Sequence, residues 1–513
     1  ISIQHSTASD CLQGDPVATY NGCMIQLQSY FGDYYIIDEI ASGGMASICL
    51  AYDRKNYRFV ALKTLFSQYA ADPVFLKRLQ REGDIYKSLR HPNIIELLDC
   101  CYEGSTPYLI LEYIHGETLA GLIARNPEGC KLRVAVRVME DIIGSLVQAH
   151  AKSIIHRDLQ PQNVLIDGCG VVKLFDFGIA YAEDDLVRTI TGTIMGTILY
   201  ASPEQSEGKE VDERADLYSL GMVFYELLTG KKAVEGNDLG EVLEKKLLSK
   251  VVPPKEHRPE IPDALNKMTL KLLEKVPDKR HRSIGALFED LIDLRCNLIG
   301  EDHKLLFGST IERELYDAKK HFAVGRFDKA FEKARIFAEK VPKKAKRRAD
   351  FVYLLARLNR AMGKNDEAEK YFDNLLTLPT ARNEHLLDFA VFMHSLGRHD
   401  DALGALEPFT ESAPLGAPAM ALRKVIKDQQ KNKVAAAILA DMDDDDDPGL
   451  MEPMTEGKPK KAESESGEGE GKEVPAAADG AEDKPSEEGD GKKKPGWRGA
   501  ISSWFSRAIS KKD

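Results

Sequence analysis

The sequence predicts an α+β fold in two lobes, followed by an all-α helical repeat domain and a disordered acidic tail. Three observations predict it. Residues 32–114 are rich in short β-type runs, residues 115–298 are mainly helical, and similar helical segments recur within 309–440. With 513 residues and 43% hydrophobic content, the chain has room for about three packed domains.

Composition argues against several classes of protein. The sequence has no run of 18 apolar residues and no signal-peptide pattern at its start, so neither a spanning helix nor secretion is expected. The eight cysteines are scattered without a CxxC pair, which favours a reduced, cytoplasmic compartment. The net charge of −12 is concentrated in an acidic segment near the C-terminus, so no basic footprint for nucleic acid is expected.

The N-terminal region begins with a segment that has no clear period. We therefore predict a flexible arm over residues 1–31. Strand-like runs then flank a turn of small residues, whose backbone N–H groups could approach phosphates closely. An ordinary hairpin turn is the alternative interpretation. The turn resembles the glycine-rich loop of protein kinases, which implies that phosphates are contacted by Ala41, Ser42, Gly43, Gly44, Met45, Ala46 and Ile48.

A lysine and a glutamate are predicted to meet in this first lobe. Lys63 lies on an apolar strand, where a buried charge needs a partner. A helix is predicted to begin with Asp72 as its N-cap and Pro73 in its first turn. Glu82 is the charged residue on the apolar face of that helix, so we expect it to point inward, towards Lys63. The alternative is an ordinary surface glutamate.

The stretch from Ile154 to Gly178 contains the strongest chemical signal. Short β-branched runs flank an Asp-Gly turn, which predicts a hairpin that brings Asn163 and Asp176 to the same end. Two oxygen ligands at one place suit Mg²⁺, which completes its shell with substrate phosphates. Asp158 lies nearby and could orient a hydroxyl nucleophile or accept its proton.

These motifs resemble those of protein kinases, in which H-R-D-L-x-x-x-N is followed by D-F-G, and V-A-I-K precedes both. The resemblance covers residues 32–298, with an N-lobe over 32–114 and a C-lobe over 115–298. It is closest to bacterial, eukaryotic-like serine/threonine kinases. It implies ATP and Mg²⁺ as cofactors, proteins as substrates, and Lys63 held by Glu82 to align the phosphates. It also implies that Ala61, Leu111, Glu112 and Ile114 contact the nucleotide, with Leu111 as gatekeeper.

The resemblance further assigns regulatory and structural residues. Arg157, directly before Asp158, implies activation by a phosphate on the following loop, with candidate sites at Thr189, Thr191 and Thr193. Thr197 resembles the threonine that contacts the catalytic aspartate. Structural roles are implied for three residues: Asp216 would brace the catalytic loop, and Arg280 would pair with Glu204. The alternative for the threonines is a loop with no regulatory role.

Two features depart from the family pattern. Serine/threonine members have lysine two residues after the catalytic aspartate, where this chain has Gln160. Glutamine can donate a hydrogen bond but cannot neutralise charge on the transferring phosphoryl group. Ala41 and Ala46 also replace two glycines of the phosphate loop. These departures motivate the alternative function, a pseudokinase scaffold that binds nucleotide as a switch and assembles partners.

The second half of the chain is helical and repetitive. Segments beginning at Gly325, Gly363 and Gly397 are similar to one another, and the pattern resembles tetratricopeptide repeats over residues 309–440. Such repeats imply a groove for a protein or peptide partner. An unrelated helical bundle is the alternative interpretation.

The C-terminal segments differ sharply in composition. Residues 441–490 are acidic and poor in large apolar residues, which predicts a disordered linker. Residues 491–513 read as a basic amphipathic helix that carries both tryptophans of the chain. Residues 494–513 are therefore expected to dock on an anionic membrane surface, so that a cytoplasmic protein lies peripherally at the inner face of the membrane. The alternatives are docking in a groove on a partner protein or on the repeats themselves, or no defined role.

Overall fold

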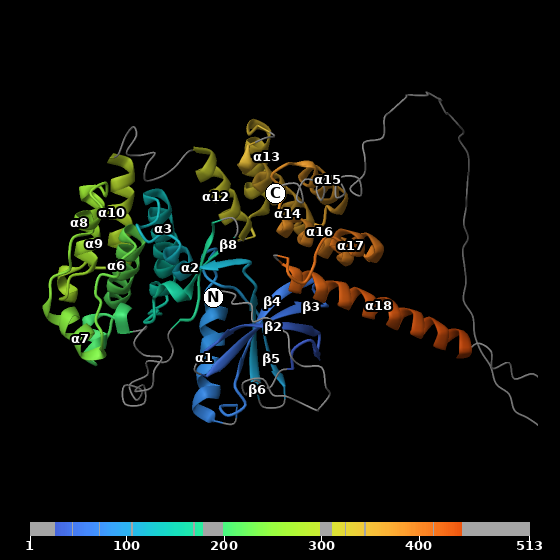
Figure 1. Cartoon of the computed structure of the whole chain (residues 1–513), viewed down its shortest axis with the longest axis horizontal. Coiled ribbons are helices and arrows are strands. Elements are labelled where there is room, and N and C mark those ends of the chain that lie inside the picture. The colour runs from blue at the N-terminus through green and yellow to red at the C-terminus, as the bar shows by residue number, and fades with distance from the viewer. Residues whose placement is uncertain are drawn as a thin grey trace, which may run out of the picture. The chain divides into compact units, whose positions relative to one another are not determined.

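The computed structural model describes residues 26–43, 45–70, 72–103, 106–167, 170–177, 198–297, 310–323, 325–342, 345–413 and 415–443. By its contacts the chain divides into two units, residues 1–426 with 497–513, and residues 427–496. In the second unit the described residues form the C-terminal part of one helix, α18 (Gly416–Asp443). The other elements belong to the first unit (Figure 1).

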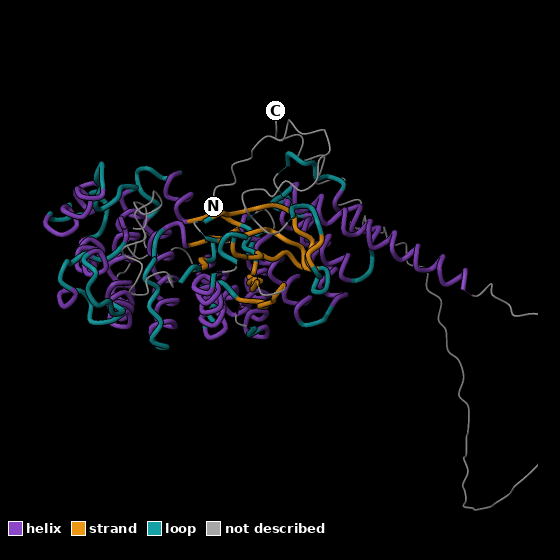
Figure 2. The backbone as a smooth tube through the Cα atoms, turned by 90° about the horizontal axis from the view of Figure 1, so that it is seen from below, coloured by secondary structure: helices purple, strands orange, loops and turns teal. Residues whose placement is uncertain are grey.

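A six-stranded antiparallel sheet forms the N-lobe, with strand order β1-β2-β3-β4-β6-β5. Figure 2 shows its strands gathered in one layer. Helix α1 (Pro73–Ser88) packs against β4, β5 and β6. The strands are β1 (Tyr30–Phe31), β2 (Tyr34–Ser42), β3 (Ala46–Asp53), β4 (Arg58–Leu65), β5 (Leu97–Glu103) and β6 (Thr106–Glu112).

Helix α1 begins where the sequence predicts. The Asp72 side chain accepts a hydrogen bond from the Val74 backbone N–H, and Pro73 occupies the first turn, where a missing N–H costs nothing. Its buried face includes Leu79, Glu82 and Tyr86. The single charged side chain on that face is therefore turned into the N-lobe.

The flexible arm predicted over residues 1–31 is wrong for its last two residues. Tyr30 and Phe31 form β1, an edge strand that pairs with β2 through Tyr35 and Tyr34. Ring contacts hold it: the Tyr30 and Tyr35 centroids lie 5.0 Å apart, and those of Phe31 and Tyr108 lie 4.8 Å apart. A two-residue strand is too short to show a period in the sequence. Residues 1–25 lie outside the described residues.

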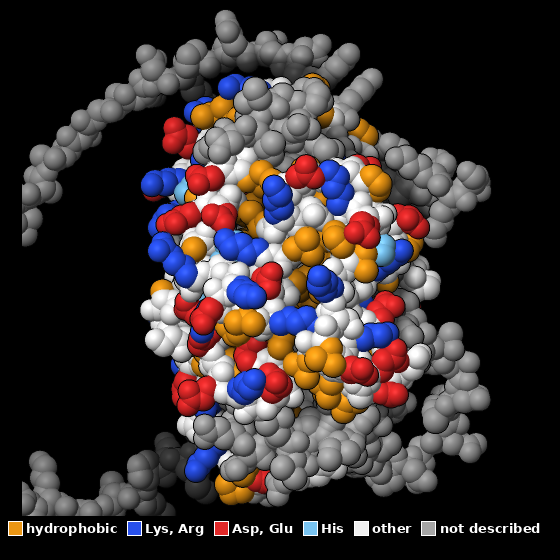
Figure 3. Space-filling model, turned by 90° about the vertical axis from the view of Figure 1, so that its left-hand side faces the viewer, with side chains coloured by type: hydrophobic (Ala, Val, Ile, Leu, Met, Phe, Trp, Pro, Cys, Tyr) orange, Lys and Arg blue, Asp and Glu red, His pale blue; other side chains and the backbone are white. Residues whose placement is uncertain are grey.

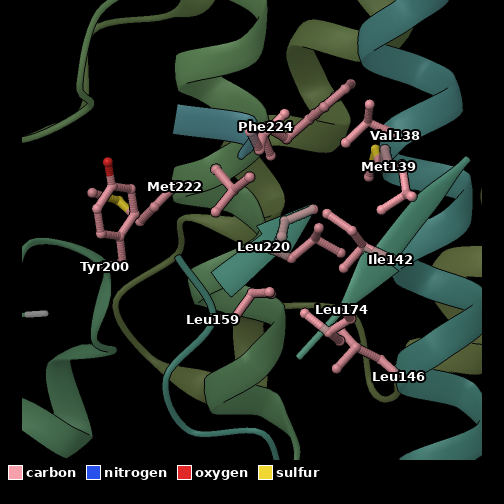
Figure 4. Packing of buried hydrophobic residues seen from close by; sticks show 14 of the residues in the cluster. Val138, Met139, Ile142, Leu146, Leu159, Leu174, Tyr200, Leu220, Met222 and Phe224 are labelled. Atoms are coloured by element: carbon pink, nitrogen blue, oxygen red, sulfur yellow. The ribbon is translucent and has the colours of Figure 1, made fainter. Parts of the chain in front are cut away.

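The C-lobe is mainly helical, and its core lies between α3 and α6. Figure 4 shows apolar side chains of these two helices packed together with Leu159 and Leu174, which belong to the catalytic stretch 154–178. The helices are α2 (Leu119–Ala124), α3 (Leu132–His150), α5 (Pro203–Ser206), α6 (Arg214–Thr229), α7 (Leu239–Leu248), α8 (Pro254–His257), α9 (Asp263–Leu272) and α10 (Ile284–Asn297), with short 3₁₀ turns η2 (Pro161–Asn163) and η3 (Pro277–Lys279).

A second, three-stranded sheet joins the C-lobe core to the catalytic stretch. Its strands are β7 (Gly116–Thr118), β8 (Val164–Asp167) and β9 (Val172–Leu174). Strands β8 and β9 pair antiparallel, which confirms the hairpin predicted between Asn163 and Asp176. The hairpin places these two residues at its open end, one just before β8 and the other just after β9.

The region after the C-lobe consists of paired helices. Its helices are α12 (Thr310–Ala323), α13 (Phe327–Lys340), α14 (Lys346–Ala361), α15 (Asn365–Thr377), α16 (Asn383–Ser395), α17 (His399–Leu406) and α18. Gly325, Gly363 and Gly397 each stand between the two helices of a pair with φ of 72° or 73°, a conformation that glycine adopts without steric cost. The assignment of these pairs to the tetratricopeptide class stays a prediction.

The C-terminal boundary of this region also differs from the prediction. Helix α18 ends at Asp443, three residues inside the predicted linker 441–490. The alanine-rich segment before Asp443 has high helix propensity, which favours continuation of the helix. The remainder of the predicted linker and the amphipathic segment 491–513 lie outside the described residues.

The helical region packs directly on the N-lobe sheet within the first unit. Alternate residues of two strands face it: Tyr35 and Ile37 of β2, and Leu50 and Tyr52 of β3, share one buried cluster with residues of α14 to α18. The Tyr52 ring lies 6.1 Å from the ring of His394 in α16, measured between centroids. The outer face of the sheet is therefore an interface rather than a solvated surface.

The helical region also reaches the C-lobe through a buried charge. Asp141 of α3 is completely buried, and the Lys320 ammonium of α12 lies 3.1 Å from its Oδ1. Burial raises the pKa of Asp141 to about 7, and Lys320 opposes that rise. One helical region thus contacts both lobes.

Two surface properties bear on partners. None of the helices in the described ranges is both long enough and apolar enough to cross a membrane. On the face shown in Figure 3, basic and acidic side chains of the described residues are interspersed. That face presents both signs of charge rather than the clustered basic residues typical of nucleic-acid binding.

The Asp141–Lys320 pair predicts a pH-dependent loss of stability. Lys320→Met leaves a buried carboxylate without its cation, which should lower the free energy of unfolding at pH 8. The expected loss is about 2 kcal/mol, less than for a fully buried ion pair, because Lys320 is partly exposed to solvent. The pKa of Asp141 is raised in the folded state, so at pH 5 the carboxyl is protonated and the loss should be smaller. Urea titrations at both values measure it.

The control is Lys329→Met, which removes an exposed lysine from the next helix, α13. Adding Asp141→Asn to Lys320→Met should recover most of the loss, because the buried charge is gone. Equal stability of Lys320→Met and Lys329→Met at pH 8 would contradict the role of the pair.

Candidate active site

The catalytic loop between α3 and β8 is anchored by one buried carboxylate. Asp216 of α6 accepts hydrogen bonds from the backbone N–H groups of His156, at 2.8 Å, and Arg157, at 2.9 Å. The His150 ring lies 2.7 Å from the same carboxylate. Arg157 has a φ of 65°, a strained conformation for a residue with a side chain, and Asp216 fixes the two backbone N–H groups that lead into it. The resemblance to protein kinases implied this bracing position for Asp216.

Asp158 follows directly and is surrounded by amide donors. The Asn163 side-chain N–H₂ donates to the Asp158 carboxylate at 2.9 Å and to its backbone oxygen at 2.8 Å. Burial and the Asp176 carboxylate raise the pKa of Asp158 to about 7, while the hydrogen bonds from Asn163 and Gln160 oppose that rise. The carboxylate is thus held in one orientation and titrates near neutrality, as suits a group that accepts a proton.

Gln160, the departure from the family pattern, is bound to Asp158. Its side-chain amide lies 3.0 Å from both carboxylate oxygens of Asp158, and the residue is 9% exposed. The amide N–H₂ is therefore committed to orienting Asp158. This contact uses the hydrogen-bonding capacity of glutamine, but it supplies no positive charge to the site.

Lys63 and Glu82 form the predicted pair. The Lys63 ammonium lies 2.7 and 2.9 Å from the two oxygens of Glu82, and the side chains are 12% and 9% exposed. The same ammonium lies 3.0 Å from Oδ1 of Asp176. Burial alone would lower the pKa of Lys63, but Asp176 and Glu82 raise it above its ordinary value, so the lysine is charged.

Asp176 is held by backbone and side chain together. Its backbone N–H donates to the Tyr86 hydroxyl at 2.8 Å, and its φ is 60°. The Lys63 ammonium lowers the pKa of Asp176, which keeps it ionised. The Asp176 side chain is 46% exposed even so. An ionised, half-exposed carboxylate beside the lysine is available to a cation or a phosphate-bound metal.

The predicted phosphate-contacting residues lie at the turn between β2 and β3. Ala41 pairs with Ile48, and Ser42 with Ser47, and the Gly43 N–H donates to the Ala46 oxygen at 2.9 Å. Met45 packs against the N-lobe core. The turn is therefore a tight hairpin that leads directly into β3, whose Ile48 pairs with Lys63 of β4. Gly44 lies outside the described residues.

The residues predicted to contact adenine lie on two adjacent strands and the segment after them. Leu111 of β6 stands opposite Ala61 of β4 in the sheet register, and both are buried. Glu112 ends β6 and forms an ion pair with Lys173 of β9, so the N-lobe sheet is tied to the catalytic hairpin at this point. Ile114 is partly buried against the same core.

The structure also forms the predicted pair between Glu204 and Arg280. Two parallel contacts, of 2.7 and 2.8 Å, join the guanidinium to the carboxylate, and the Arg280 side chain is completely buried. The four predicted threonines Thr189, Thr191, Thr193 and Thr197 lie outside the described residues.

The donor set fits Mg²⁺ with ATP phosphates. Asn163 donates its N–H₂ to Asp158, which leaves its amide oxygen as an acceptor, and Asp176 contributes an ionised carboxylate. Two protein oxygens beside a lysine match the preference of Mg²⁺ for few protein ligands and several phosphate or water oxygens. The residues present therefore fit the cofactors that the sequence predicted.

Several residues that hold the site were not predicted, among them Tyr86, His156 and Gln205. Tyr86 holds the Asp176 backbone, and lies four residues after Glu82, so helical spacing could have indicated it. His156 donates from Nε2 to the Phe175 oxygen at 3.1 Å, and its position before Arg157 was a signal. Gln205 donates to the Arg157 oxygen at 2.8 Å, a contact across 48 residues with no local signal.

Comparisons with known proteins agree with this geometry. A family model described as "Protein kinase domain" matches residues 34–290, about half of the chain. A second model, for an uncharacterized protein conserved in bacteria, matches residues 305–391.

Curated relatives match over a similar range. The chain is 36% identical over 260 residues to the serine/threonine-protein kinase PrkC of Bacillus subtilis, and the matched region covers 51% of this chain and 40% of PrkC. It is 36% identical over 270 residues to the serine/threonine-protein kinase PknB of Mycolicibacterium smegmatis, and the matched region covers 51% of this chain and 43% of PknB. A probable serine/threonine-protein kinase of Clostridium acetobutylicum is 33% identical over 271 residues, and the matched region covers 53% of this chain and 41% of that relative. The chain therefore spans less than half the length of these relatives.

Proposed function

Because the chain belongs to the protein kinase family, we propose that it transfers the γ-phosphate of ATP to serine or threonine hydroxyls of proteins. The observation that carries the proposal is the convergence of charged groups at one place. Lys63 bonds both Glu82 and Asp176, while Asp158 and Asn163 bond each other beside them. Phosphoryl transfer depends mainly on such positioning and electrostatic stabilisation.

Each group has a role that follows from its contacts. Lys63, held by Glu82, would align the ATP phosphates through its positive charge. Asp176 and Asn163 would hold Mg²⁺, which when bound neutralises charge on the phosphates. Asp158, oriented by two amides, would position the substrate hydroxyl and accept its proton. Ala41 to Ala46 would approach the phosphates with backbone N–H groups, and Ala61, Leu111, Glu112 and Ile114 would contact adenine.

Gln160 does not supply the positive charge that lysine has at this position in serine/threonine kinases. It orients Asp158, but it places no positive charge next to the transferring phosphoryl group. We therefore expect a working site with turnover below that of an otherwise equal site with lysine at this position. The pseudokinase scaffold, which binds nucleotide without transferring phosphate, is the outcome that the experiments below would reveal.

Regulation by the loop after Asp176 is part of the proposal. Arg157 precedes Asp158, and a phosphate on Thr189, Thr191 or Thr193 could order the site through a charge-assisted pair. Thr197 would contact Asp158. The Glu204–Arg280 pair and Asp216 support this arrangement by fixing the segments on either side of it.

The regions outside the kinase domain receive their roles from sequence alone. We propose that the helical region, as tetratricopeptide repeats, binds a protein or peptide partner, and that the protein is cytoplasmic. We further propose that residues 494–513 dock on an anionic membrane at its inner face. Deletion of 494–513 should abolish co-sedimentation with anionic vesicles, and unchanged co-sedimentation would exclude that role.

Asp158→Asn separates catalysis from binding. The amide keeps the shape of the side chain but cannot accept a proton, so transfer to a protein substrate should fall by about 10²- to 10⁴-fold. ATP binding, measured by calorimetry with MgATP, should change little, because Asp158 does not contact the nucleotide in this account. The control is Asp84→Asn on the exposed face of α1.

Two results would count against this assignment. Parallel loss of ATP binding and transfer in Asp158→Asn would show that Asp158 has no specific role in transfer. ATP binding without transfer in the unaltered protein would favour the scaffold.

Gln160→Lys tests the missing charge. The ammonium would stabilise negative charge on the transferring group, and kcat should rise by a factor of about 3 to 10 at saturating MgATP. The control is Gln162→Lys, because Gln162 is exposed two residues along the same loop. A fall in kcat with Gln160→Lys alone would mean that the glutamine contacts to Asp158 outweigh the missing charge.

A further inference from the structure

The helical region contacts the N-lobe through polar side chains as well as through the shared apolar cluster. Arg360 of α14 donates to the backbone oxygen of Tyr57, in the turn between β3 and β4, at 3.3 Å. The His394 ring of α16 lies 5.1 Å from the Tyr57 ring, measured between centroids. The Lys424 ammonium of α18 lies 5.2 Å from the centroid of the Tyr35 ring. Three helices therefore hold the N-lobe sheet and one of its turns.

The first helix of the region holds the C-lobe in a similar way. The Arg137 guanidinium of α3 lies 4.5 Å from the centroid of the Tyr316 ring in α12, a cation–π contact. One turn of α12 further on, Lys320 pairs with Asp141 of the same α3 helix. These side chains belong to α12, α14 and α16, the first helices of the three pairs, and to α18. Their common surface, here called the contact face, touches both lobes.

The contact face also reaches the segment that joins the lobes. Residues 113–115, here called the hinge, connect β6 to β7. Tyr113 packs against the cluster that α14 to α18 share with β2 and β3, whereas Ile114 packs against the core around the active site. Burial lowers the pKa of His115, and the charge of Glu384, in the first turn of α16, opposes that shift. The beginning of α16 therefore lies close to the hinge.

One residue of β2 connects the contact face to the phosphate turn. Ile40 directly precedes Ala41, the first residue of that turn. Its side chain packs against both buried clusters, the one shared with the helical region and the one around the active site. Movement of the helical region would therefore change the packing of a side chain next to the turn. The hinge and Ile40 are thus two places where the region meets segments predicted to contact nucleotide.

The interface between the helical region and the N-lobe is not packed like a permanent core. Among the described residues, neither the buried Tyr52 hydroxyl nor the His394 Nε2 has a hydrogen-bond partner. Both atoms would gain water on separation, and a buried polar atom without a partner is costly. The docked and the separated arrangements are therefore closer in free energy than the apolar contacts alone would make them.

We propose that the contact face is a regulatory interface whose ligand is the kinase domain of the same chain. Docked on both lobes, the helical region fixes the hinge and the end of β2, and thereby sets the affinity of the kinase domain for MgATP. This role goes beyond the proposed transfer of phosphate, and it is measured by nucleotide binding. Because coupling between two contacts is reciprocal, MgATP must in turn favour docking.

A double substitution outside the nucleotide site tests the effect on affinity. Tyr57→Asn removes the ring beside His394, and asparagine adopts the φ of 51° found at this position more readily than tyrosine, so the turn should persist. Lys424→Glu replaces the cation at the Tyr35 ring with an anion. In the full chain, calorimetry should show a rise of about tenfold in Kd for MgATP, as expected when about one molecule in ten stays docked.

The matched control is Tyr102→Asn with Lys364→Glu. It makes the same two changes at exposed positions, in β5 and between α14 and α15, and its Kd should stay within about twofold of the unaltered value. Hydrogen–deuterium exchange without nucleotide separates docking from general destabilisation. In the first double variant, exchange should become faster in the hinge and at the end of β2, while exchange in α6 stays unchanged.

The reciprocal effect can be measured without any variant. In the unaltered protein, saturating MgATP should slow backbone exchange of α16 around His394, although these residues lie outside the nucleotide site. The double variant Tyr57→Asn with Lys424→Glu should show a smaller effect at the same saturation.

Each outcome decides the proposal. A Kd of the first double variant within twofold of its control overturns it, and so does α16 exchange in the unaltered protein that is equal with and without MgATP. If that variant does not fold, the exchange experiment on the unaltered protein decides alone. Binding of MgATP without phosphate transfer would refute the proposed function and leave both tests valid, whereas no MgATP binding would refute the proposed function and the regulatory interface together.

Discussion

The contact of Lys63 with Glu82 and Asp176 is the constraint on which the active site depends. The lysine comes from a central strand, the glutamate from α1, and the aspartate from the C-lobe loop after β9. The buried Lys63 ammonium needs both partners, because moving either carboxylate away would leave a buried positive charge less well paired. The position of α1 against the sheet and the approach of the two lobes are thereby coupled. Tyr86 strengthens the coupling, since it extends from the same helix to the Asp176 backbone.

The C-lobe uses buried polar groups for a different purpose. Its apolar core between α3 and α6 supplies rigidity, and buried polar groups fix loops to that core: Asp216 holds the catalytic loop, Glu204 with Arg280 holds α5, and Lys246 holds residues 198–201. Each bonds backbone or a single counter-charge rather than solvent. Precision at Asp158 therefore comes from groups that do not touch substrate, as a preorganised site requires.

Much of the site could be predicted because its residues have local signals. The helical spacing around Glu82 and the hairpin between Asn163 and Asp176 are short-range patterns, and the structure shows both. Lys246 had no such signal, because a lysine in an amphipathic helix is normally exposed and its partners lie 45 to 48 residues away. The Gln160 contact was also not predictable, since a flexible amide two residues from Asp158 could equally face phosphate. Packing of the helical region on the N-lobe depends on the outward residues of β2 and β3, whose aromatic character was the available clue.

The most direct test of the central claim is transfer of labelled γ-phosphate from MgATP by the full, unaltered protein, with the labelled residues mapped by mass spectrometry. The account predicts label on Thr189, Thr191 or Thr193 and on added protein, because Lys63, Asp158 and Asp176 form a working site despite Gln160. Measurable MgATP binding with no label on either would contradict it, and would assign the kinase domain a nucleotide-binding role alone.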